Sequence, residues 1–214
     1  MMFANRREAG EKLARELLHH QGQNPLILGI PRGGVPIARE IHELLGGELD
    51  VVIPRKVGLP WHRELAAGAV TMDGSFILNH QVARGHGITE EDLAGEIDRA
   101  RQEIRRRMEL YRGHRPLPVY RGRTVILTDD GVATGFTMRA ALQDLREKEV
   151  GQLVLALPVA PADTHRVLQR EVDELVCLSV PAVFYAVGQF YRDFSQLTDQ
   201  EVIKILTAGR RDGS

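Results

Sequence analysis

The chain has 214 residues, with 28 Lys and Arg against 29 Asp and Glu, so its net charge is −1 at pH 7. This balance gives no overall electrostatic reason to expect a nucleic acid or a membrane as a partner. The length fits one domain, and no apolar run approaches the roughly 20 residues that span a bilayer. The single cysteine, Cys177, excludes a disulfide framework. Together with an N-terminus that lacks an apolar signal segment, it predicts a cytoplasmic protein.

The N-terminal quarter of the chain alternates between helical and strand patterns. Asn5, followed by Glu8, resembles a capping box and begins an amphipathic helix that ends near residue 20. A short apolar strand at 25–30 and the turn Pro31-Arg32-Gly33-Gly34 precede a second helix at 35–45. A strand at 49–53 completes the order strand, helix, strand, which implies a right-handed parallel crossover.

The middle of the chain is rich in basic residues. The segment 54–62 contains Pro and Gly, so it is predicted to be a mobile loop, and residues 59–64 are expected to close over a nearby site. Strands are expected at 66–72 and 76–78, with a hairpin turn between them. A long Arg-rich helix follows from residue 89 to 111. Because no aromatic residues interleave with its arginines, a solvated face is favoured over a nucleic-acid site.

The stretch 124–138 carries the most informative pattern. A buried strand at 124–127 is followed by two acids and then by a loop that Gly131 and Gly135 bound, before a helix begins near residue 137. Such a loop turns backbone N–H groups toward one point at a helix N-terminus. The unpaired donors and the helix macrodipole both favour a phosphate at that point.

The two acids, Asp129 and Asp130, would repel a phosphate bound at this loop unless a sugar separates the phosphate from the acids. Carboxylates accept hydrogen bonds from vicinal ribose hydroxyls and can hold Mg²⁺ through water, while the hydroxyls of Thr134 and Thr137 add donors to the loop. An ordinary acidic strand end with glycines in turn positions is the alternative. Acyl-phosphate chemistry on a strand-end Asp is less favoured, because no companion acid and lysine lie around this loop.

The rest of the chain continues the alternation, with strands at 152–157 and 172–178 and a helix at 162–170 between them. This order predicts an α/β fold with a mostly parallel, doubly wound sheet. In such sheets ligands bind at the carboxyl ends of strands, near the point where the strand order reverses. The Gly-containing turns at Arg32 and Gly131 both follow strands, as that rule requires.

The string from Val125 to Gly135, Val-Ile-Leu-Thr-Asp-Asp-Gly-Val-Ala-Thr-Gly, resembles the phosphoribosyl-pyrophosphate (PRPP) signature of type I phosphoribosyltransferases. Over nearly its full length the chain is also similar to a bacterial phosphoribosyltransferase family with Pro-Arg-Gly-Gly, Arg-Lys-Val-Gly and Asp-Asp-Gly-Val-Ala-Thr-Gly blocks. This resemblance implies a single domain over 1–214, with a helical insertion at about 79–118 and a small C-terminal hood at about 180–208. It also implies a homodimer.

The resemblance assigns roles to the residues of these blocks. It implies that Asp129 and Asp130 orient the ribose and hold Mg²⁺, directly or through water. The implied 5′-phosphate site comprises Gly131, Val132, Ala133, Thr134, Gly135 and Thr137. The implied pyrophosphate site comprises Arg32, Gly33, Gly34, Arg55 and Lys56, and the last two would also act in catalysis.

The acceptor stays open, because two signals disagree. Ala133 stands where 6-oxopurine enzymes of this type carry an Asp near the base, and Ala there is similar to adenine enzymes. Residues 180–193, however, faintly resemble the 6-oxopurine C-terminal segment, in which an aromatic stacks on the base and an acid follows. Phe184 or Tyr185 would then stack on the acceptor with Asp193 near the metal or pyrophosphate, or the aromatic is simply part of the core.

Three functions compete at this point. The favoured one is transfer of the phosphoribosyl group of PRPP to a nitrogenous acceptor, foremost a nucleobase, with release of pyrophosphate, as in nucleotide salvage. The second is a PRPP- or nucleotide-sensing regulatory protein that keeps the fold without turnover. The third is hydrolysis or phosphorolysis of a phosphoribosylated substrate without base transfer.

Overall fold

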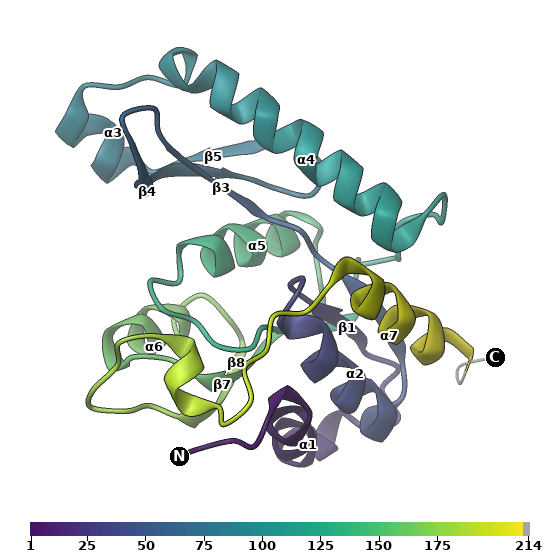
Figure 1. Ribbon diagram of the computed structural model, residues 1–214. Coiled ribbons are helices and arrows are strands. Elements are labelled where there is room, and N and C mark those ends of the chain that lie inside the picture. Colours follow the sequence, from purple (N-terminus) through teal and green to yellow (C-terminus); the bar gives the residue numbers. More distant parts are fainter. Residues whose placement is uncertain (212–214) are drawn as a thin grey trace.

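A computed structural model describes residues 1–211, apart from the side chains of residues 63, 64, 210 and 211. The main body contains a five-stranded sheet in the order β2-β1-β6-β7-β8 (Figure 1). Its strands are β1 (Leu26–Gly29), β2 (Glu48–Val51), β6 (Thr124–Thr128), β7 (Gln152–Val159) and β8 (Glu174–Ser179). Neighbouring strands pair in parallel, so the predicted α/β fold is confirmed.

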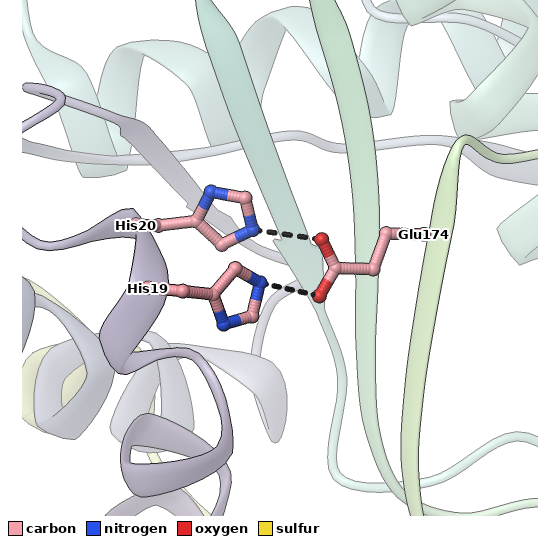
Figure 2. A group of neighbouring side chains, drawn as sticks. All are labelled: His19, His20 and Glu174. Carbon is pink, nitrogen blue, oxygen red and sulfur yellow. Dashed lines mark hydrogen bonds and ion pairs between the residues drawn. The ribbon is translucent and has the colours of Figure 1, made fainter.

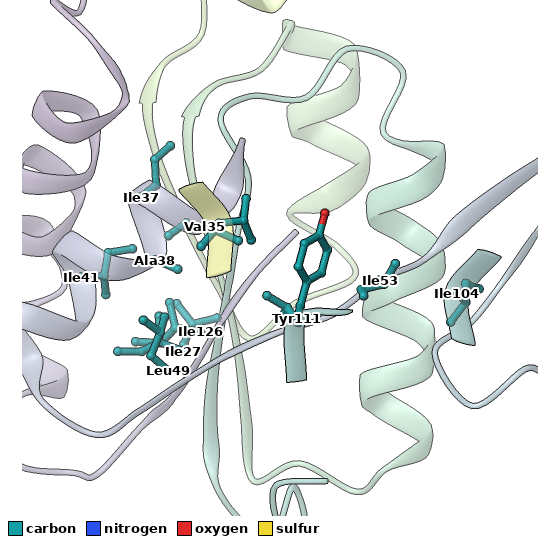
Figure 3. Packing of buried hydrophobic residues seen from close by; sticks show 14 of the residues in the cluster. Ile27, Val35, Ile37, Ala38, Ile41, Leu49, Ile53, Ile104, Tyr111 and Ile126 are labelled. Carbon is teal, nitrogen blue, oxygen red and sulfur yellow. The ribbon is translucent and has the colours of Figure 1, made fainter. Parts of the chain in front are cut away.

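Helices cover both faces of this sheet. One face carries α1 (Arg6–Glu16), α2 (Gly34–Leu45) and α7 (Asp199–Arg211), and the other carries α5 (Phe136–Glu147) and α6 (Ala162–Leu168). Ile27 and Ile126 join the first buried cluster, where α2 packs over them (Figure 3). Leu28 and Leu127 join the second. Because successive strand residues point to opposite faces, β1 and β6 are apolar throughout and buried on both sides.

The capping residues predicted from the sequence lie at the ends of α1 and α2. The N–H of Glu8 donates to Oδ1 of Asn5 at 3.0 Å, so Asn5 caps α1 as expected. A single 3-10 turn, η1 (Leu18–His20), follows α1. At the end of α2, Gly46 adopts a φ of +74°, a backbone conformation that favours glycine.

A second, antiparallel sheet in the order β3-β4-β5 lies above the main body (Figure 1). Its strands are β3 (Arg55–Leu59), β4 (His62–Val70) and β5 (Phe76–Leu78). The helices α3 (His80–His86) and α4 (Ala94–Arg112) follow, with the 3-10 turn η2 (Glu91–Leu93) before α4. The expected strands near 66–72 and 76–78 are therefore confirmed, and Val70 pairs with Phe76 across the turn.

The prediction of a mobile loop at 54–62 is wrong. This segment forms β3 and the hairpin turn to β4, with Lys56 opposite Ala69 and Leu59 opposite His62. Val57 and Leu59 alternate with less buried residues and are both buried, which is the period of a half-buried strand. The Pro and Gly content concealed this alternation. The expected closing segment 59–64 includes two side chains, 63 and 64, that lie outside the described residues.

The long helix α4 buries one apolar face and leaves most of its arginines at least partly exposed, as predicted, but Arg112 at its end is buried. Ile97 and Ile104 are buried, whereas Arg106 and Arg107 bind Glu103 one turn earlier, at 2.8 and 2.7 Å. The hydrogen bonds from Arg106 and Arg107 lower the pKa of Glu103 to about 2. The arginine-rich face is thus a solvated face with intrahelical ion pairs.

The C-terminal part of the chain returns to the N-terminus. It contains the 3-10 turn η3 (Val187–Phe190), and the N–H of Phe3 donates to the carbonyl of Phe190 at 2.8 Å. The helix α7 then packs beside α2 (Figure 1). Residues 180–208, expected to form a hood, therefore run along the same side of the sheet as α1 and α2. Within residues 1–211, every helix is too short or too polar to cross a lipid bilayer.

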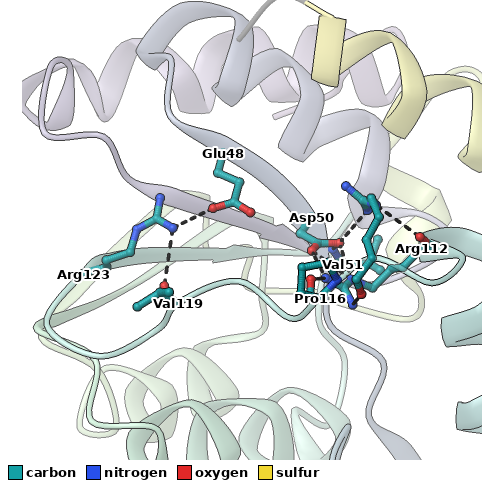
Figure 4. Close-up of polar contacts among 8 residues, drawn as sticks. Glu48, Asp50, Val51, Arg112, Pro116, Val119 and Arg123 are labelled. Carbon is teal, nitrogen blue, oxygen red and sulfur yellow. Dashed lines mark hydrogen bonds and ion pairs between the residues drawn. The ribbon is translucent and has the colours of Figure 1, made fainter. Parts of the chain in front are cut away.

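A buried ion pair joins the helix α4 to the main sheet. The carboxylate of Asp50, on β2, lies 2.9 and 3.0 Å from Nε of Arg112 at the end of α4 (Figure 4). Their side chains are only 2% and 5% exposed. Arg112 also donates to the carbonyl of Pro116 at 2.7 Å, so its guanidinium is held on several sides. A buried pair of this kind fixes geometry more than it adds stability, but removing one partner leaves an uncompensated charge.

We therefore predict that Arg112→Ala lowers the free energy of unfolding by about 3–5 kcal/mol. The buried carboxylate of Asp50 would then keep only the longer ion pair with Arg115, at 3.7 Å. Urea denaturation at pH 7 measures this loss. The matched control is Arg121→Ala, which breaks an ion pair with Glu149 whose side chains are 76% and 64% exposed. The control should cost less than about 1 kcal/mol. Equal losses in the two variants would contradict the role given to the buried pair.

Candidate active site

The candidate site lies between β1 and β6, where the strand order reverses. The chain leaves β1 toward β2 at one edge of the sheet, and it returns to β6 on the other side of β1. Gly29 and Thr128 are partners at the carboxyl ends of the two strands. In open parallel sheets the crevice beyond such a reversal is where ligands bind. The turn after β1 and the acidic loop after β6 therefore meet at one place.

The turn at 31–34 packs directly against the end of β6. The N–H of Ile30 donates to the carbonyl of Thr128 at 3.0 Å, and the Pro31–Arg32 peptide bond is cis. A Cβ atom on Gly33 would lie 1.9 Å from Oδ2 of Asp130, and one on Gly34 would lie 2.6 Å from the carbonyl oxygen of Thr128. Only glycines permit this approach, so the turn and the acids share one surface.

The two acids are half-buried and differ in their partners. The N–H of Asp130 donates to Oδ1 of Asp129 at 2.8 Å. The Asp130 carboxylate binds Nε of Arg6 at 2.8 Å, and the side chains of this pair are 15% and 12% exposed. Arg6 also lies 4.0 Å from the ring centroid of Phe194. The hydroxyl of Tyr191 donates to the carbonyl oxygen of Asp130 at 2.6 Å. Asp130 is therefore fixed from three sides.

The acid pair carries poorly compensated negative charge. Burial, and then the charge of Asp130, raises the pKa of Asp129 well above its ordinary value. Burial also raises the pKa of Asp130, although the hydrogen bond and charge of Arg6 act in the opposite direction. Carboxylate oxygens are the ligands that Mg²⁺ prefers, and a cation here would relieve the repulsion. The donor set of Asp129 and Asp130 thus fits a magnesium ion.

The loop at 131–135 is shaped by glycines and open to solvent at its middle. Gly131 has a φ of +152° and packs against Val159 and Val187, and Gly135 has a φ of +74° at the start of α5. Ala133 and Thr134 between them are exposed. The loop therefore presents its backbone to solvent, where a solute can reach it.

The N–H groups of this loop are available to an anion. The first helical hydrogen bond of α5 runs from Arg139 to the carbonyl of Gly135, at 2.8 Å. Among the described residues, no acceptor is found for the N–H groups of residues 133–137. The hydroxyl of Thr164 donates to the carbonyl of Ala133 at 2.6 Å and holds that peptide in place. Unpaired donors at a helix N-terminus favour an anion, so this geometry is compatible with the predicted anion site.

The three basic residues assigned to pyrophosphate lie in two places. Arg32 is half-buried in the turn at 31–34, and within residues 1–211 no carboxylate pairs with its guanidinium. Arg55 and Lys56 lie on β3, along a cavity of about 260 Å³ that Glu96 of α4 also lines. A nitrogen of the Arg55 guanidinium is 3.8 Å from Glu103 on the same helix. The structure thus brings Arg32, Gly33 and Gly34 to the acid pair, and it sets Arg55 and Lys56 on the small sheet.

The three residues suggested for the acceptor also differ in their surroundings. Phe184 is half-buried, and its ring centroid is 5.4 Å from that of Phe190, which is the behaviour of a core aromatic. Tyr185 is 87% exposed, and its N–H donates to Oε1 of Gln189 at 2.8 Å. Asp193 is exposed, and the N–H of Ser195 donates to its carboxylate and lowers its pKa.

Sequence reasoning missed three residues that shape the site: Arg6, Tyr191 and Thr164. Arg6 lies 124 residues from its partner Asp130 in the chain, so no local spacing connects them. Tyr191 likewise reaches Asp130 from 61 residues away. Thr164 could have been found from the sequence. It lies in α6, directly after β7, and β7 is the strand that pairs with β6.

Comparison with known proteins decides the family of this fold and site. The family described as Phosphoribosyl transferase domain matches residues 4–195 of the chain. The chain belongs to this family. The resemblance found in the string 125–135 is thereby confirmed, and the β6–loop–α5 unit belongs to a phosphoribosyltransferase fold.

Two relatives show how far this similarity extends. A Mycobacterium tuberculosis protein, provisionally named a phosphoribosyl transferase, is 40% identical over 211 residues, which are 99% of this chain and 48% of that protein. This phosphoribosyltransferase-family chain therefore spans about half the length of that curated relative. The crystal structure of TT1426 from Thermus thermophilus is 43% identical, with a TM-score of 0.85 over 97% of this chain and 99% of that one.

We predict that Asp129→Asn stabilises the ligand-free protein at pH 8. A raised pKa in the folded state means that folding stability falls as pH rises from the unfolded value, near 3.9, through the folded one. The variant lacks this loss, so its advantage should be large at pH 8 and shrink toward pH 4. Denaturation at several pH values measures the difference. Asp163→Asn, at a side chain that is 94% exposed, is the control and should show no such trend. A destabilised Asp129→Asn protein at pH 8 would contradict the charge repulsion.

Proposed function

We propose that the protein transfers the 5-phosphoribosyl group of PRPP to a nitrogenous acceptor, foremost a nucleobase, and releases pyrophosphate. The observation that carries this proposal is the meeting of three structures beyond β1 and β6. They are the turn at 31–34, the acid pair Asp129 and Asp130, and the open loop at 131–135. Each suits one part of PRPP: its pyrophosphate, its ribose and its 5′-phosphate.

The 5′-phosphate would bind at the N-terminus of α5. The N–H groups of residues 133–137 and the hydroxyls of Thr134 and Thr137 supply donors, and the helix macrodipole adds a favourable field. One sugar-length away, the carboxylates of Asp129 and Asp130 would accept hydrogen bonds from the ribose hydroxyls. The ion pair with Arg6 supports this placement, since it offsets the charge of Asp130 beside an anionic ligand.

The reaction breaks the bond between C1 of the ribose and the pyrophosphate oxygen, and it forms a bond from C1 to a nitrogen of the acceptor. The proton of that nitrogen passes to solvent, because Ala133 provides no base there. Positive charge develops on the sugar and negative charge on the leaving group. Arg32 and the N–H groups of the turn would stabilise the leaving pyrophosphate. Asp129 and Asp130 would hold Mg²⁺, whose charge would neutralise the same oxygens.

Arg55 and Lys56 would complete the pyrophosphate site only if β3 approaches the turn at 31–34 when PRPP binds. We propose Tyr185, rather than the half-buried Phe184, as the residue that stacks on the acceptor, with Asp193 near the metal or the pyrophosphate. The exposure of Tyr185 supports this, because a solvent-facing ring is free to cover a base. By family resemblance we also propose a cytoplasmic homodimer that acts in nucleotide salvage.

A PRPP- or nucleotide-sensing role is the second candidate, and two contacts favour it. In the described chain Arg6 already occupies one oxygen of Asp130, and the Arg55 guanidinium lies beside Glu103 of α4 rather than beside the acid pair. A protein that only binds PRPP needs the loop at 131–135 and the acids. It does not need cations to stabilise a departing pyrophosphate.

Calorimetric titration of PRPP with Mg²⁺ into the intact protein tests the shared basis of both candidates. We expect saturable binding. We also expect Asp130→Asn to cost about 2 kcal/mol in PRPP binding or in transition-state stabilisation, because its charge orients the sugar or the metal. The control is Asp98→Asn, at a 65% exposed side chain on α4, which should bind like the parent protein. If the intact protein shows no PRPP binding, both candidates fail.

A screen of nucleobases for pyrophosphate release separates the two candidates. Release with at least one base, lost in Asp130→Asn and kept in Asp98→Asn, supports the transferase. PRPP binding without release from any base supports the sensor. Ribose 5-phosphate as the product in the absence of a base would instead indicate hydrolysis.

A further inference from the structure

Two histidines and a glutamate meet at the amino end of the main sheet, on the side opposite the phosphoribosyl site. His19 and His20 belong to η1, and Glu174 is the first residue of β8. Nε2 of His19 lies 2.8 Å from one carboxylate oxygen of Glu174, and Nε2 of His20 lies 2.9 Å from the other (Figure 2). The potential ligand atoms of the three residues all lie within 4.8 Å of one another.

The hydrogen bonds of Gln23 decide the tautomer of His20. The amide nitrogen of Gln23 donates to the carbonyl oxygen of His19 at 2.9 Å, and a carbonyl can only accept. The amide oxygen of Gln23 therefore faces Nδ1 of His20, at 3.2 Å. Since that oxygen also only accepts, Nδ1 of His20 must carry a hydrogen.

A neutral His20 then has a lone pair on Nε2, and that lone pair points at a carboxylate oxygen. Nε2 of His20 and the carboxylate oxygen of Glu174 would then be two acceptors only 2.9 Å apart. Such a contact is stable only if a proton or a cation lies between the two atoms. One solution is a second proton on an imidazole whose side chain is only 2% exposed. The other is a cation that binds Nε2 and the carboxylate together. An imidazole that binds a metal through one ring nitrogen usually donates a hydrogen bond from the other, which fixes the orientation of the ring. Nδ1 of His20 donates to Gln23 in this way, so Nε2 is the nitrogen left to bind a metal.

We propose that His19, His20 and Glu174 form a binding site for a divalent transition-metal ion of the Zn²⁺ class. Two imidazole nitrogens and a carboxylate suit Zn²⁺, whereas Mg²⁺ prefers oxygen ligands alone. Bonds of about 2.0–2.2 Å place tetrahedral ligands about 3.3 Å apart. The two nitrogen–oxygen separations, 2.8 and 2.9 Å, therefore need to open by only a few tenths of an ångström, and the two imidazole nitrogens already lie within 4.8 Å of each other. His19 is 54% exposed, which leaves an entry path and a fourth position for water.

The metal site joins segments that are distant in sequence. His20 and Glu174 are 154 residues apart, and the ion would tie the end of the N-terminal helical segment to the edge strand β8. The site lies at the strand ends away from Asp129, so it is independent of the proposed transferase activity. Its expected role is to stabilise the fold by binding only the folded chain.

Titration of Zn²⁺ alone into the chelator-treated full chain tests this site. We expect a dominant site for one Zn²⁺ per chain and a rise in Tm of about 5 °C or more at Zn²⁺ concentrations near 100 times the Kd. His19→Ala and Glu174→Gln should weaken binding more than about tenfold. His19 is exposed, so its replacement leaves the core intact. The control His86→Ala, at an exposed residue on α3, should bind Zn²⁺ like the parent protein.

X-ray absorption at the zinc edge should report two imidazole nitrogens among the ligands. Asp129→Asn should keep the same Zn²⁺ affinity, which separates this site from the acid pair. No Zn²⁺ binding, or equal affinity in His19→Ala and the parent chain, would overturn the proposal and leave a protonated His20 paired with Glu174. Loss of the ion in Asp129→Asn alone would overturn it as well.

Discussion

The direct contact between the turn at 31–34 and the acidic end of β6 is the constraint on which the rest of the site depends. Neither Gly33 nor Gly34 can carry a Cβ there, because it would overlap Asp130 or the backbone of Thr128. The parallel pairing of β1 and β6 sets the two strand ends side by side, and the glycines remove the last separation between them. The turn, which we propose binds pyrophosphate, and the two carboxylates can therefore face one ligand, and the ion pair with Arg6 offsets the charge of Asp130.

Local patterns predicted most of the main body, because each unit contains its own signals. The β-branched strand, the two acids and the spaced glycines of 124–138 predicted β6, the loop and α5 within a few residues. The turn at 31–34 was predicted in the same way. Arg6 and Tyr191 could not be found, since they reach Asp130 only through the assembled fold. In β3 the Pro and Gly content outweighed a short alternation, and the strand was predicted as a loop.

Two polar contacts connect α4, the helix that packs on the small sheet, to the main body. Arg112 and Asp50 form a buried pair between α4 and β2, and the Tyr111 hydroxyl donates to Asp199 on α7. These contacts hold α4, which packs on β3, above the main body (Figure 1). Polar contacts at the C-terminal end of α4 therefore help to set the position of Arg55 and Lys56 relative to the acid pair. Under the proposed function, Arg55 and Lys56 must approach the acid pair for the protein to stabilise a leaving pyrophosphate as well as to bind PRPP.

We propose that one site between β1 and β6 binds all three parts of PRPP. A crystal structure of the intact chain with PRPP and Mg²⁺ tests it most directly. We expect electron density for the 5′-phosphate at the N–H groups of residues 133–137 and for the ribose hydroxyls at Asp129 and Asp130. The pyrophosphate should lie at the turn of Arg32, Gly33 and Gly34. Density for PRPP elsewhere, with residues 129–135 unengaged, would contradict it.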